Sequence, residues 1–314
     1  MYRKLSIGAV IPAYNEELLI GSTIESIPDF VDYIVIVNDG SKDGTLNIIR
    51  KYKKSDKRIV LINNTCNRGI GFSLKAAIKM ASELGSDRIV VIAGDAQMDT
   101  KQIIPLIDNM TLRNLDFIKA NRFMHFSALK KMPRHRRVGN IIVTILTKFS
   151  TGYYSIFDTQ NGYVVYTNDI VKRIPWDLVG DRYEYENTIL IGLSIIDAKI
   201  GDYPIPAIYN NEKSTIKLFS TTTRVLHVLF KGFWQRIYYK YILYGFHPIA
   251  LFLFCGLFFL VAGVGIGGWI LFSKIITGTV PTSGTVMLAV LPMLVGLQML
   301  LTALVMDVIE EKRS

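Results

Sequence analysis

The sequence contains very few cysteines, only two among 314 residues. Cys66 lies in a polar part of the chain and Cys255 lies in a long apolar run, so the two thiols are expected in environments too different for them to pair. The sequence therefore implies neither a disulfide framework nor a metal site built from thiolates.

Acidic residues are absent from a long C-terminal stretch, because none occurs between Glu212 and Asp307. The formal net charge is +10, and several basic residues precede the first long apolar run: Lys213, Lys217, Arg224, Lys231, Arg236 and Lys240. Basic chains commonly bind nucleic acid. A basic flank beside membrane spans explains the same residues more simply, so no nucleic-acid partner is predicted.

Charged residues of either sign are missing from 249–272 and again from 275–306. Each run is long enough for a helix that crosses a hydrocarbon core of ~30 Å. We predict two transmembrane helices, at about 249–272 and 286–306.

The basic residues also predict how these helices cross a membrane. Only Lys274 lies in their short connection, whereas Lys312 and Arg313 follow the second helix. Positive charge collects on the cytoplasmic side, and no signal peptide is apparent at the start of the chain. The expected location is the cell membrane, with two spans and with both termini and about the first 245 residues in the cytoplasm.

Residues 214–247 mix aromatic and basic side chains, a composition typical of helices that lie at a membrane surface. The predicted organisation is a cytoplasmic domain at 1–213, juxtamembrane amphipathic helices at 214–247 and a transmembrane hairpin at 248–314. Gly263 and Gly267 form a small-xxx-small pair that would let the spans pack closely.

The N-terminal part alternates short apolar runs with segments of helical pattern. Strands are expected at 6–11, 33–37, 58–62, 89–92 and 116–120. This spacing is typical of βαβ units, and it predicts an α/β fold with a mostly parallel, Rossmann-like sheet. Ligands of such sheets bind at the carboxyl ends of the strands.

The run at 89–92 stops at Gly94, and Asp95 follows it directly. A carboxylate is thereby delivered to the carboxyl end of a central strand, and Gln97 offers an amide oxygen two residues later. Hard oxygen ligands of this kind suit Mg²⁺ or Mn²⁺ held against a pyrophosphate. Taken alone, the segment is equally consistent with a strand that ends in a polar turn.

Three more polar turns are expected at the same edge of the sheet, at 12–16, 38–45 and 67–71. Each has an ordinary structural explanation by itself. Gly69-Ile70-Gly71, for example, lacks the third glycine of a dinucleotide fingerprint. Their shared position is what indicates a ligand site.

These turns, joined by Gly94-Asp95-Ala96-Gln97, resemble in content and order the motifs of family 2 inverting glycosyltransferases with a GT-A fold. The chain is most similar to the branch of dolichol-phosphate mannose synthases and polyprenyl-phosphate glycosyltransferases. The resemblance covers about the first 245 residues. It implies transfer of a hexose from a nucleotide diphosphate sugar, of the UDP-glucose or GDP-mannose type, to dolichyl or undecaprenyl phosphate at the cytoplasmic face.

The resemblance also assigns roles to residues. Asp95 and Gln97 would hold Mg²⁺ or Mn²⁺, although Ala93 replaces the first aspartate of the family's Asp-X-Asp motif. Asp39 would hydrogen-bond the base. The implied nucleotide-sugar site comprises Pro12, Ala13, Tyr14, Glu16, Asn38, Asp39, Gly71, Asp95, Ala96 and Gln97.

The implied catalytic residues are Asp95, Arg122, Arg137 and Glu184. Both arginines resemble the family's phosphate-binding arginines, and a guanidinium fork suits a diphosphate or an acceptor phosphate. Because a polyprenyl phosphate is already an oxyanion, Glu184 or Glu186 would position the acceptor rather than deprotonate it. The alternative is that both carboxylates merely stabilise the start of a helix.

Two rival functions remain open at this point. One is a membrane-bound family 2 transferase that acts on a glycan or glycerolipid hydroxyl, with Glu184 or Glu186 as the base. The other is a non-catalytic membrane protein that binds nucleotide sugars, which Ala93 would favour. The expected partners are the nucleotide sugar, the polyprenyl phosphate and the lipid bilayer, and a homo-oligomer through the spans is a further hypothesis.

Overall fold

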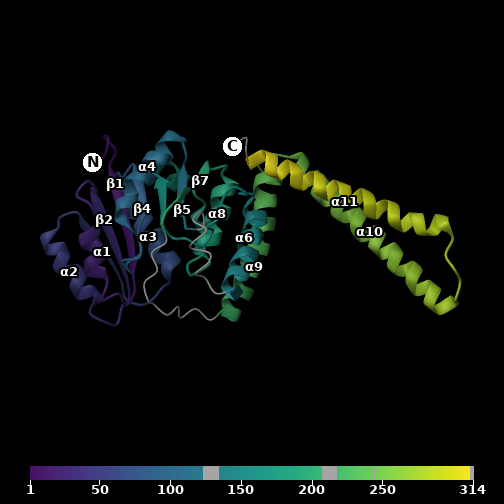
Figure 1. Ribbon diagram of the computed structural model, residues 1–314, viewed down its shortest axis with the longest axis horizontal. Coiled ribbons are helices and arrows are strands. Elements are labelled where there is room, and N and C mark those ends of the chain that lie inside the picture. The colour runs from purple at the N-terminus through teal and green to yellow at the C-terminus, as the bar shows by residue number, and fades with distance from the viewer. Residues whose placement is uncertain (123–133, 207–217, 244, 312–314) are drawn as a thin grey trace. The chain divides into compact units, whose positions relative to one another are not determined.

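The structure, a computed structural model, describes residues 1–122, 134–206, 218–243 and 245–311 (Figure 1). Its internal contacts divide the chain into two compact units, Met1–Phe233 and Trp234–Ser314. Each unit is described separately below.

A seven-stranded sheet forms the centre of the first unit, with strand order β3-β2-β1-β4-β6-β5-β7 (Figure 1). Strand β6 runs antiparallel to both of its neighbours, whereas the other strand pairs are parallel. The predicted mostly parallel α/β sheet is therefore confirmed. The strands are β1 Ile7–Ala13, β2 Tyr33–Asp39, β3 Ile59–Asn64, β4 Arg88–Val91, β5 Phe117–Asn121, β6 Val164–Thr167 and β7 Ile200–Pro204.

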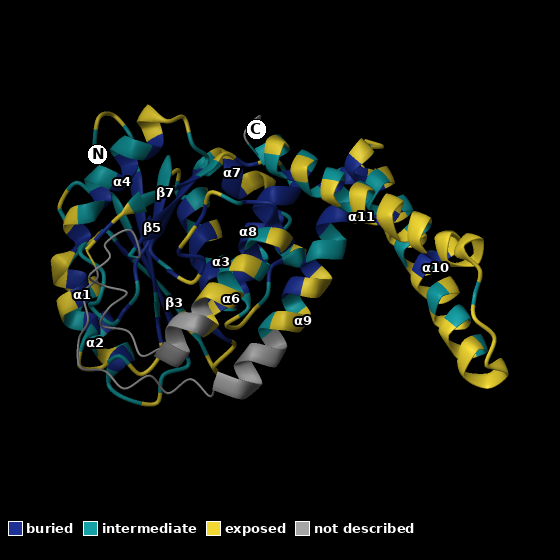
Figure 2. Ribbon diagram, turned by 45° about the vertical axis from the view of Figure 1, so that its right-hand side comes forward, coloured by how far each residue is buried: buried dark blue, intermediate teal, exposed yellow. Residues whose placement is uncertain are grey.

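The central strands are apolar on both faces because helices cover both sides of the sheet. Along β1, Ile11 belongs to a core with α1, α2 and α4, whereas Val10 belongs to a core with α3, α7 and α8. Figure 2 shows the buried strands between helices whose outer surfaces are exposed. These helices are α1 Ile20–Ser26, α2 Thr45–Ser55, α3 Ile70–Glu83, α4 Ile103–Leu112, α7 Asn168–Arg173 and α8 Tyr185–Ile195.

The remaining described elements of this unit are the 3₁₀ turns η1 Thr100–Gln102 and η2 Trp176–Leu178, and helix α6 Arg134–Thr151. Helix α9 Leu218–Arg236 crosses the division between the two units, and a π-helix, Ile237–Leu243, follows it. The predicted amphipathic segment is thus helical at 218–243, whereas residues 245–247, which precede α10, are not helical.

Two long helices, α10 Pro248–Thr277 and α11 Ser283–Glu311, make up most of the second unit. Both are long and apolar enough to cross a membrane, and both are mostly exposed rather than buried in a protein core. They contain the two spans predicted from the sequence and suggest that the protein associates with a membrane. His247 caps α10 through Nδ1, which accepts a hydrogen bond from the N–H of Ile249 at 3.3 Å.

Small residues allow α10 and α11 to approach each other closely. A Cβ at Gly296 would lie 2.6 Å from the Leu260 nitrogen, and one at Gly263 would lie 2.5 Å from Cγ of Met293. At Gly267, predicted to pair with Gly263, an added Cβ would make only an ordinary contact, 3.8 Å from Cβ of Ala289. The small-residue contact is therefore centred on Gly263 and Gly296, not on Gly267.

A buried ion pair joins the segment before α10 to the end of α11. The Arg236 guanidinium donates to both carboxylate oxygens of Asp307, at 2.7 and 3.0 Å, and the Tyr241 hydroxyl donates to Oδ1 of Asp307 at 2.5 Å. Arg236 is 1% exposed and Asp307 is 7% exposed. This pairing explains why an acidic residue ends a run that contains no other charge.

We predict that Asp307→Asn destabilises the protein by about 3–5 kcal/mol, because it leaves the buried Arg236 guanidinium without its counter-charge. Thermal unfolding of the full chain in detergent measures the effect. The double variant Arg236→Met/Asp307→Asn is the control, and it should recover much of the loss because no buried charge remains. A double variant as unstable as Asp307→Asn would contradict this explanation.

Candidate functional site

A cavity of about 440 Å³ opens at the carboxyl ends of β1, β2 and β4. Carboxyl ends of parallel strands meet at one edge of a sheet, so turns that are distant in the sequence come together there. The lining residues are Pro12, Ala13, Tyr14, Glu16, Asp39, Asn67, Gly69, Ile70, Ser73, Ala93, Gly94, Asp95, Arg182 and Tyr183.

Six of the residues expected at the nucleotide-sugar site line this cavity. They are Pro12, Ala13, Tyr14, Glu16, Asp39 and Asp95. The other expected residues, Asn38, Gly71, Ala96 and Gln97, are not in its lining. The structure thus brings the predicted motifs together at one cavity, although four of the expected residues lie outside its lining.

Asp39 is buried at the end of β2 and organises the loop that follows β3. Its Oδ1 accepts hydrogen bonds from the Asn64 side chain at 2.8 Å and from the Arg68 N–H at 3.0 Å, and its Oδ2 accepts from the Gly69 N–H at 2.9 Å. Each carboxylate oxygen offers two lone-pair directions. Only one of these bonds is made to Oδ2, so its second lone pair can accept a hydrogen bond from a ligand in the cavity.

Asn38 and Gly71 support the cavity from outside it. The Asn38 amide donates to Oδ1 of Asn63 at 2.7 Å, which joins β2 to β3. Gly71 lies at the start of α3, where a Cβ would be only 2.3 Å from the carbonyl oxygen of Gly180. Glycine is required there because the chain around residue 180 passes directly over α3.

Asp95 supplies the carboxylate that fits a divalent cation. Its Oδ1 accepts from the Gln97 N–H at 3.0 Å, and Ala96 between them has a positive φ of 55° that tightens the turn. Among the described residues, no basic side chain pairs with the Asp95 carboxylate, so a negative charge faces the cavity uncompensated. Mg²⁺ commonly takes one or two protein carboxylates plus substrate phosphates. The Asp95 carboxylate fits this donor set, whereas Gln97, the other predicted ligand, does not line the cavity.

Arg182 and Tyr183 line the cavity although the sequence analysis gave them no role. Their segment is fixed over α3, because the Phe72 N–H donates to the Asp181 carbonyl at 2.8 Å and Lys75 forms an ion pair with the Asp181 carboxylate at 2.5 Å. From the polar segment at 181–186, the sequence predicted roles for the carboxylates of Glu184 and Glu186 but none for Arg182. The contact with α3 is tertiary and carries no signal in the sequence.

Arg122 follows β5 and is held by a fully buried carboxylate, Asp158. Its Nε and Nη2 donate to the two Asp158 oxygens at 2.8 and 3.1 Å, and its backbone N–H donates to Oδ2 at 3.2 Å. Asp158 thus fixes the direction of the Arg122 guanidinium, and the Arg122 side chain as a whole is about one-third exposed. Neither residue lines the cavity. Arg137 belongs to α6, and its side chain lies outside the described part of the chain.

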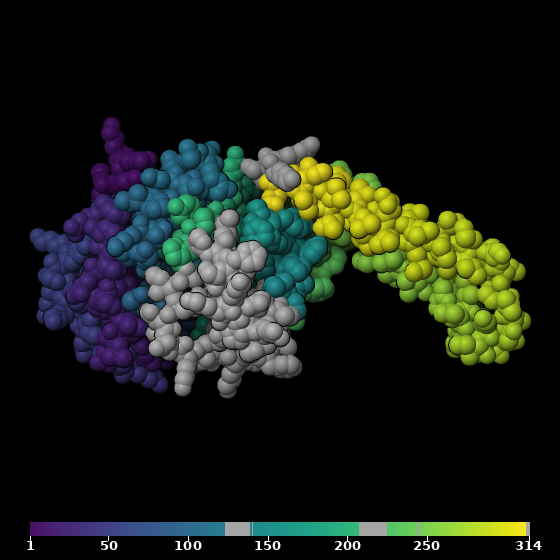
Figure 3. All heavy atoms as spheres, in the orientation of Figure 1, coloured from purple at the N-terminus to yellow at the C-terminus, as the bar shows by residue number. Residues whose placement is uncertain are grey.

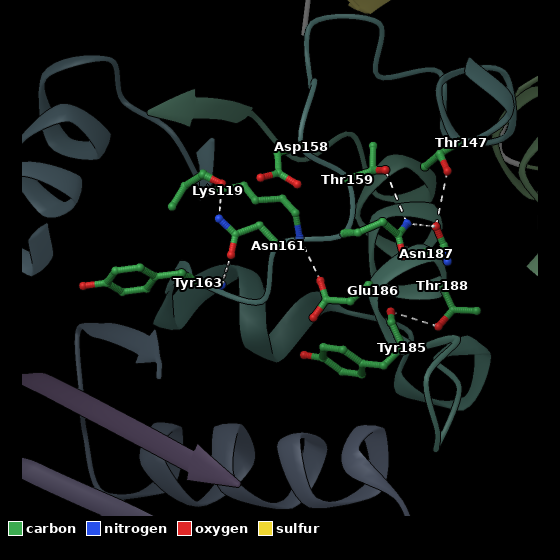
Figure 4. Close-up of polar contacts among 12 residues, drawn as sticks. Lys119, Thr147, Asp158, Thr159, Asn161, Tyr163, Tyr185, Glu186, Asn187 and Thr188 are labelled. Atoms are coloured by element: carbon green, nitrogen blue, oxygen red, sulfur yellow. Dashed lines mark hydrogen bonds and ion pairs between the residues drawn. The ribbon is translucent and has the colours of Figure 1, made fainter. Parts of the chain in front are cut away.

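Glu186 forms an ion pair with Lys119, whose side chain is fully buried, at 2.8 Å (Figure 4). In the same region the Asn161 amide donates to the Ala120 carbonyl oxygen, and the Gln160 amide donates to Asn187. These contacts join β5 to the loop at 158–161 and to α8. The Glu186 carboxylate is therefore a structural counter-charge.

Glu184 immediately precedes α8, and its side chain packs on Gly180. Its Oε1 accepts from the Arg182 N–H at 3.3 Å, and it is absent from the cavity lining. Its side chain makes no hydrogen bond that caps α8, and its Oε2 is buried without a hydrogen-bond partner among the described residues. Glu184 also supports the segment that carries Arg182 and Tyr183.

Asp202, on β7, is an ionisable group that the sequence analysis missed. Burial raises its pKa to about 6, even though its Oδ2 accepts hydrogen bonds from the Phe157 N–H at 2.8 Å and from the Asn121 amide at 2.7 Å. Phe157 is adjacent to Asp158, so Asp202 fixes the backbone beside the carboxylate that holds Arg122.

The model of the family described as "Glycosyl transferase family 2" matches residues 9–174, more than half of the chain. The chain belongs to this family. The match includes all the cavity-lining turns except the segment with Arg182 and Tyr183. The protein is thus a glycosyltransferase, as the motifs indicated.

Two relatives of this glycosyltransferase match it over most of their own length. An uncharacterized protein of Methanocaldococcus jannaschii is 30% identical over 239 residues, which cover 75% of this chain and 94% of that protein. A UDP-N-acetylglucosamine–dolichyl-phosphate N-acetylglucosaminyltransferase of Methanococcus voltae is 29% identical over 64% of this chain and 84% of its own.

A solved structure shares the fold. Glucosyl-3-phosphoglycerate synthase from Mycobacterium tuberculosis, in complex with Mn²⁺, UDP-glucose and phosphoglyceric acid, is 18% identical and superposes with a TM-score of 0.56 over 73% of this chain and 80% of its own. The GT-A fold that the resemblance implied is confirmed. That neighbour binds Mn²⁺ together with a nucleotide sugar.

We predict that Gly71→Ala destabilises the glycosyltransferase by about 1–3 kcal/mol and weakens nucleotide-sugar binding, because the added methyl displaces the segment that carries Arg182. Thermal unfolding and calorimetric titration with UDP-glucose and GDP-mannose measure the two effects. Gly21→Ala in α1 is the control, since its Cβ would make only an ordinary contact at 3.4 Å. Equal behaviour of the two variants would refute the explanation.

The raised pKa of Asp202 predicts a pH dependence of stability. Because the folded-state pKa, about 6, exceeds the unfolded value near 4, the folded protein binds more protons between these values, and this group's contribution to stability falls as pH rises through that window. Asp202→Asn removes the titration. The measurement is the difference in unfolding temperature between the variant and the wild type. This difference should increase from pH 4.5 to 7 and then level off. A difference that does not change with pH would contradict the raised pKa of Asp202.

Proposed function

We propose that the enzyme transfers a hexose, with inversion, from a nucleotide diphosphate sugar to a polyprenyl phosphate such as dolichyl or undecaprenyl phosphate. One observation carries the donor half of this proposal. The motifs of a family 2 transferase converge on a single cavity, into which Asp95 directs a carboxylate without a basic partner among the described residues.

The acceptor half is supported by the two long apolar helices, which give the transferase a means of meeting a lipid substrate. The relative from Methanococcus voltae acts, by its name, on dolichyl phosphate and matches this chain over 84% of its own length. We therefore favour a phosphate on a long-chain lipid as the acceptor.

The proposed reaction is a single displacement. An oxygen of the acceptor phosphate forms a bond to the anomeric carbon, while the bond from that carbon to the diphosphate breaks and the nucleoside diphosphate leaves. A divalent cation held by Asp95 and Gln97 would neutralise charge on the departing diphosphate. Arg122, fixed by Asp158, would provide a positively charged group for a phosphate.

A sugar or glycerolipid hydroxyl as acceptor would require a general base. Of the two carboxylates considered for that task from the sequence, Glu186 pairs with Lys119, and neither Glu184 nor Glu186 lines the cavity. A phosphate acceptor needs no such base, so this arrangement favours the polyprenyl phosphate.

We further propose that α10 and α11 both cross the cell membrane, with the catalytic unit and both termini in the cytoplasm. The basic residues that precede α10 and follow α11 support this orientation. Accessibility of single introduced cysteines to an impermeant thiol reagent in intact cells tests it.

The reaction itself is tested by transfer of radiolabelled sugar into organic-extractable lipid. Purified full-length protein would be incubated with Mg²⁺ or Mn²⁺, with dolichyl or undecaprenyl phosphate, and with UDP-glucose, GDP-mannose or UDP-N-acetylglucosamine in turn. Label in the lipid phase from one donor supports the proposal and identifies the sugar. Label only on a soluble glycan or glycerolipid would overturn the proposed acceptor.

We predict that Asp95→Asn lowers kcat/KM for this transfer by about 100-fold or more, because a neutral amide binds the cation more weakly and does not balance its positive charge. Asp99→Asn is the matched control in the same turn. The Asp99 carboxylate accepts from the Lys101 N–H at 3.0 Å and does not line the cavity, so its loss should cost little activity. Full activity of Asp95→Asn would refute the role of the carboxylate.

A further inference from the structure

Helix α11 carries one amide side chain in the middle of its apolar length. Gln298 lies 15 residues after Ser283 and 13 residues before Glu311. Its side chain is exposed, and among the described residues no hydrogen-bond partner for its amide is found. In the proposed membrane orientation, this amide lies near the centre of the hydrocarbon layer.

An unpaired amide is costly in that environment. Lipid chains offer neither donors nor acceptors, so transfer of an amide from water without a compensating hydrogen bond costs several kcal/mol. Polar side chains in membrane helices are therefore commonly paired across helix contacts. Gln298 is exposed toward lipid and does not face α10. A partner outside this chain is therefore the simplest way for its amide to be hydrogen-bonded.

Helix α11 carries two lengthwise rows of residues, each with a seven-residue period. The first, Ala289, Gly296 and Ala303, is buried within the second unit, and Gly296 lies against Leu260 of α10. The second, which we call the outer seam, alternates steps of three and four residues. It consists of Met287, Leu291, Leu294, Gln298, Leu301 and Val305.

Every member of the outer seam is exposed, the five apolar side chains by 47–57%. Figure 3 shows the long surface of α11, in yellow. The steps of three and four are those of positions a and d in a coiled coil, and Gln298 occupies an a position among aliphatic residues. One polar residue at such a position specifies the register and number of helices that associate.

We propose that the outer seam of α11 packs against the outer seam of a second copy of this chain, with the two Gln298 amides hydrogen-bonded to each other. Two copies in one membrane have the same orientation, so their α11 helices run parallel and Gln298 meets Gln298 at equal depth. The inference rests on the proposed membrane insertion and is independent of the transfer reaction.

A second copy matches this surface in its chemistry. An amide has both a donor and an acceptor, so two identical amides related by a twofold axis complement each other. Lipid chains would cover the leucines equally well but would leave the amide unpaired. Since α10 occupies the opposite side of α11, contact through the outer seam alone closes a dimer instead of building an open chain.

The first experiment measures association of fluorescently labelled full-length protein in phosphatidylcholine vesicles by energy transfer, over a range of protein-to-lipid ratios. Gln298→Leu keeps the bulk of the side chain and removes the amide, and it should weaken dimerisation about 3- to 20-fold. Val261→Ala is the control. Val261 is 62% exposed on α10, next to Leu260, and therefore lies at the depth of Gly296.

The second experiment identifies the surface directly. In a Cys66→Ser/Cys255→Ala background, Leu294→Cys and Leu301→Cys place thiols on the outer seam and leave Gln298 intact. Oxidation in vesicles should cross-link both variants as dimers, whereas Val261→Cys should form no cross-link because its thiol lies away from the proposed contact.

Unchanged association of Gln298→Leu, or cross-linking through Val261→Cys in place of the seam positions, would overturn the proposal. Extraction of the protein from membranes at alkaline pH would also overturn it, by removing the membrane insertion on which it rests. The transfer assay is run separately on the same samples. A dimer without transfer activity would argue against the proposed function alone.

Discussion

Parallel pairing of β1 with β2 and β4 is the constraint on which the proposed site depends. It places the carboxyl ends of three strands at one edge of the sheet, so the turns that carry Tyr14, Asp39 and Asp95 open into one cavity. Asp39 then ties the strand ends to the loop after β3 through hydrogen bonds to backbone N–H groups. The sheet determines where the polar groups meet, and buried polar contacts keep them there.

Two ion pairs of the first unit are formed by residues that do not line the cavity. Lys119 with Glu186 and Arg122 with Asp158 each join a buried side chain to one with more access to solvent. Such pairs fix side-chain direction because breaking one would leave a charge buried without its partner. Asp95 lines the cavity without a basic partner among the described residues. Asp39, which also lines it, already accepts hydrogen bonds on both carboxylate oxygens, so Asp95 is the better suited of the two to receive a cation.

The second unit follows a different physical rule, because its helices are apolar on nearly all sides. Close contact between α10 and α11 comes from glycine and alanine, and the Arg236–Asp307 pair joins the segment before α10 to the end of α11. An exposed amide on such a helix is then more informative than any exposed leucine. In the membrane environment proposed for these helices, leucine is covered by lipid and glutamine is not satisfied by it.

The sequence by itself determined the alternation of strands and helices, the mostly parallel sheet, both long apolar helices and the family, because these depend on local hydrophobic pattern and on ordered motifs. Only the tertiary structure decided the contacts between distant segments. It placed Arg182 in the cavity, paired Arg122 with Asp158 and raised the pKa of Asp202 by burial. Such contacts join residues far apart in the chain, and no local pattern encodes which side chains will meet.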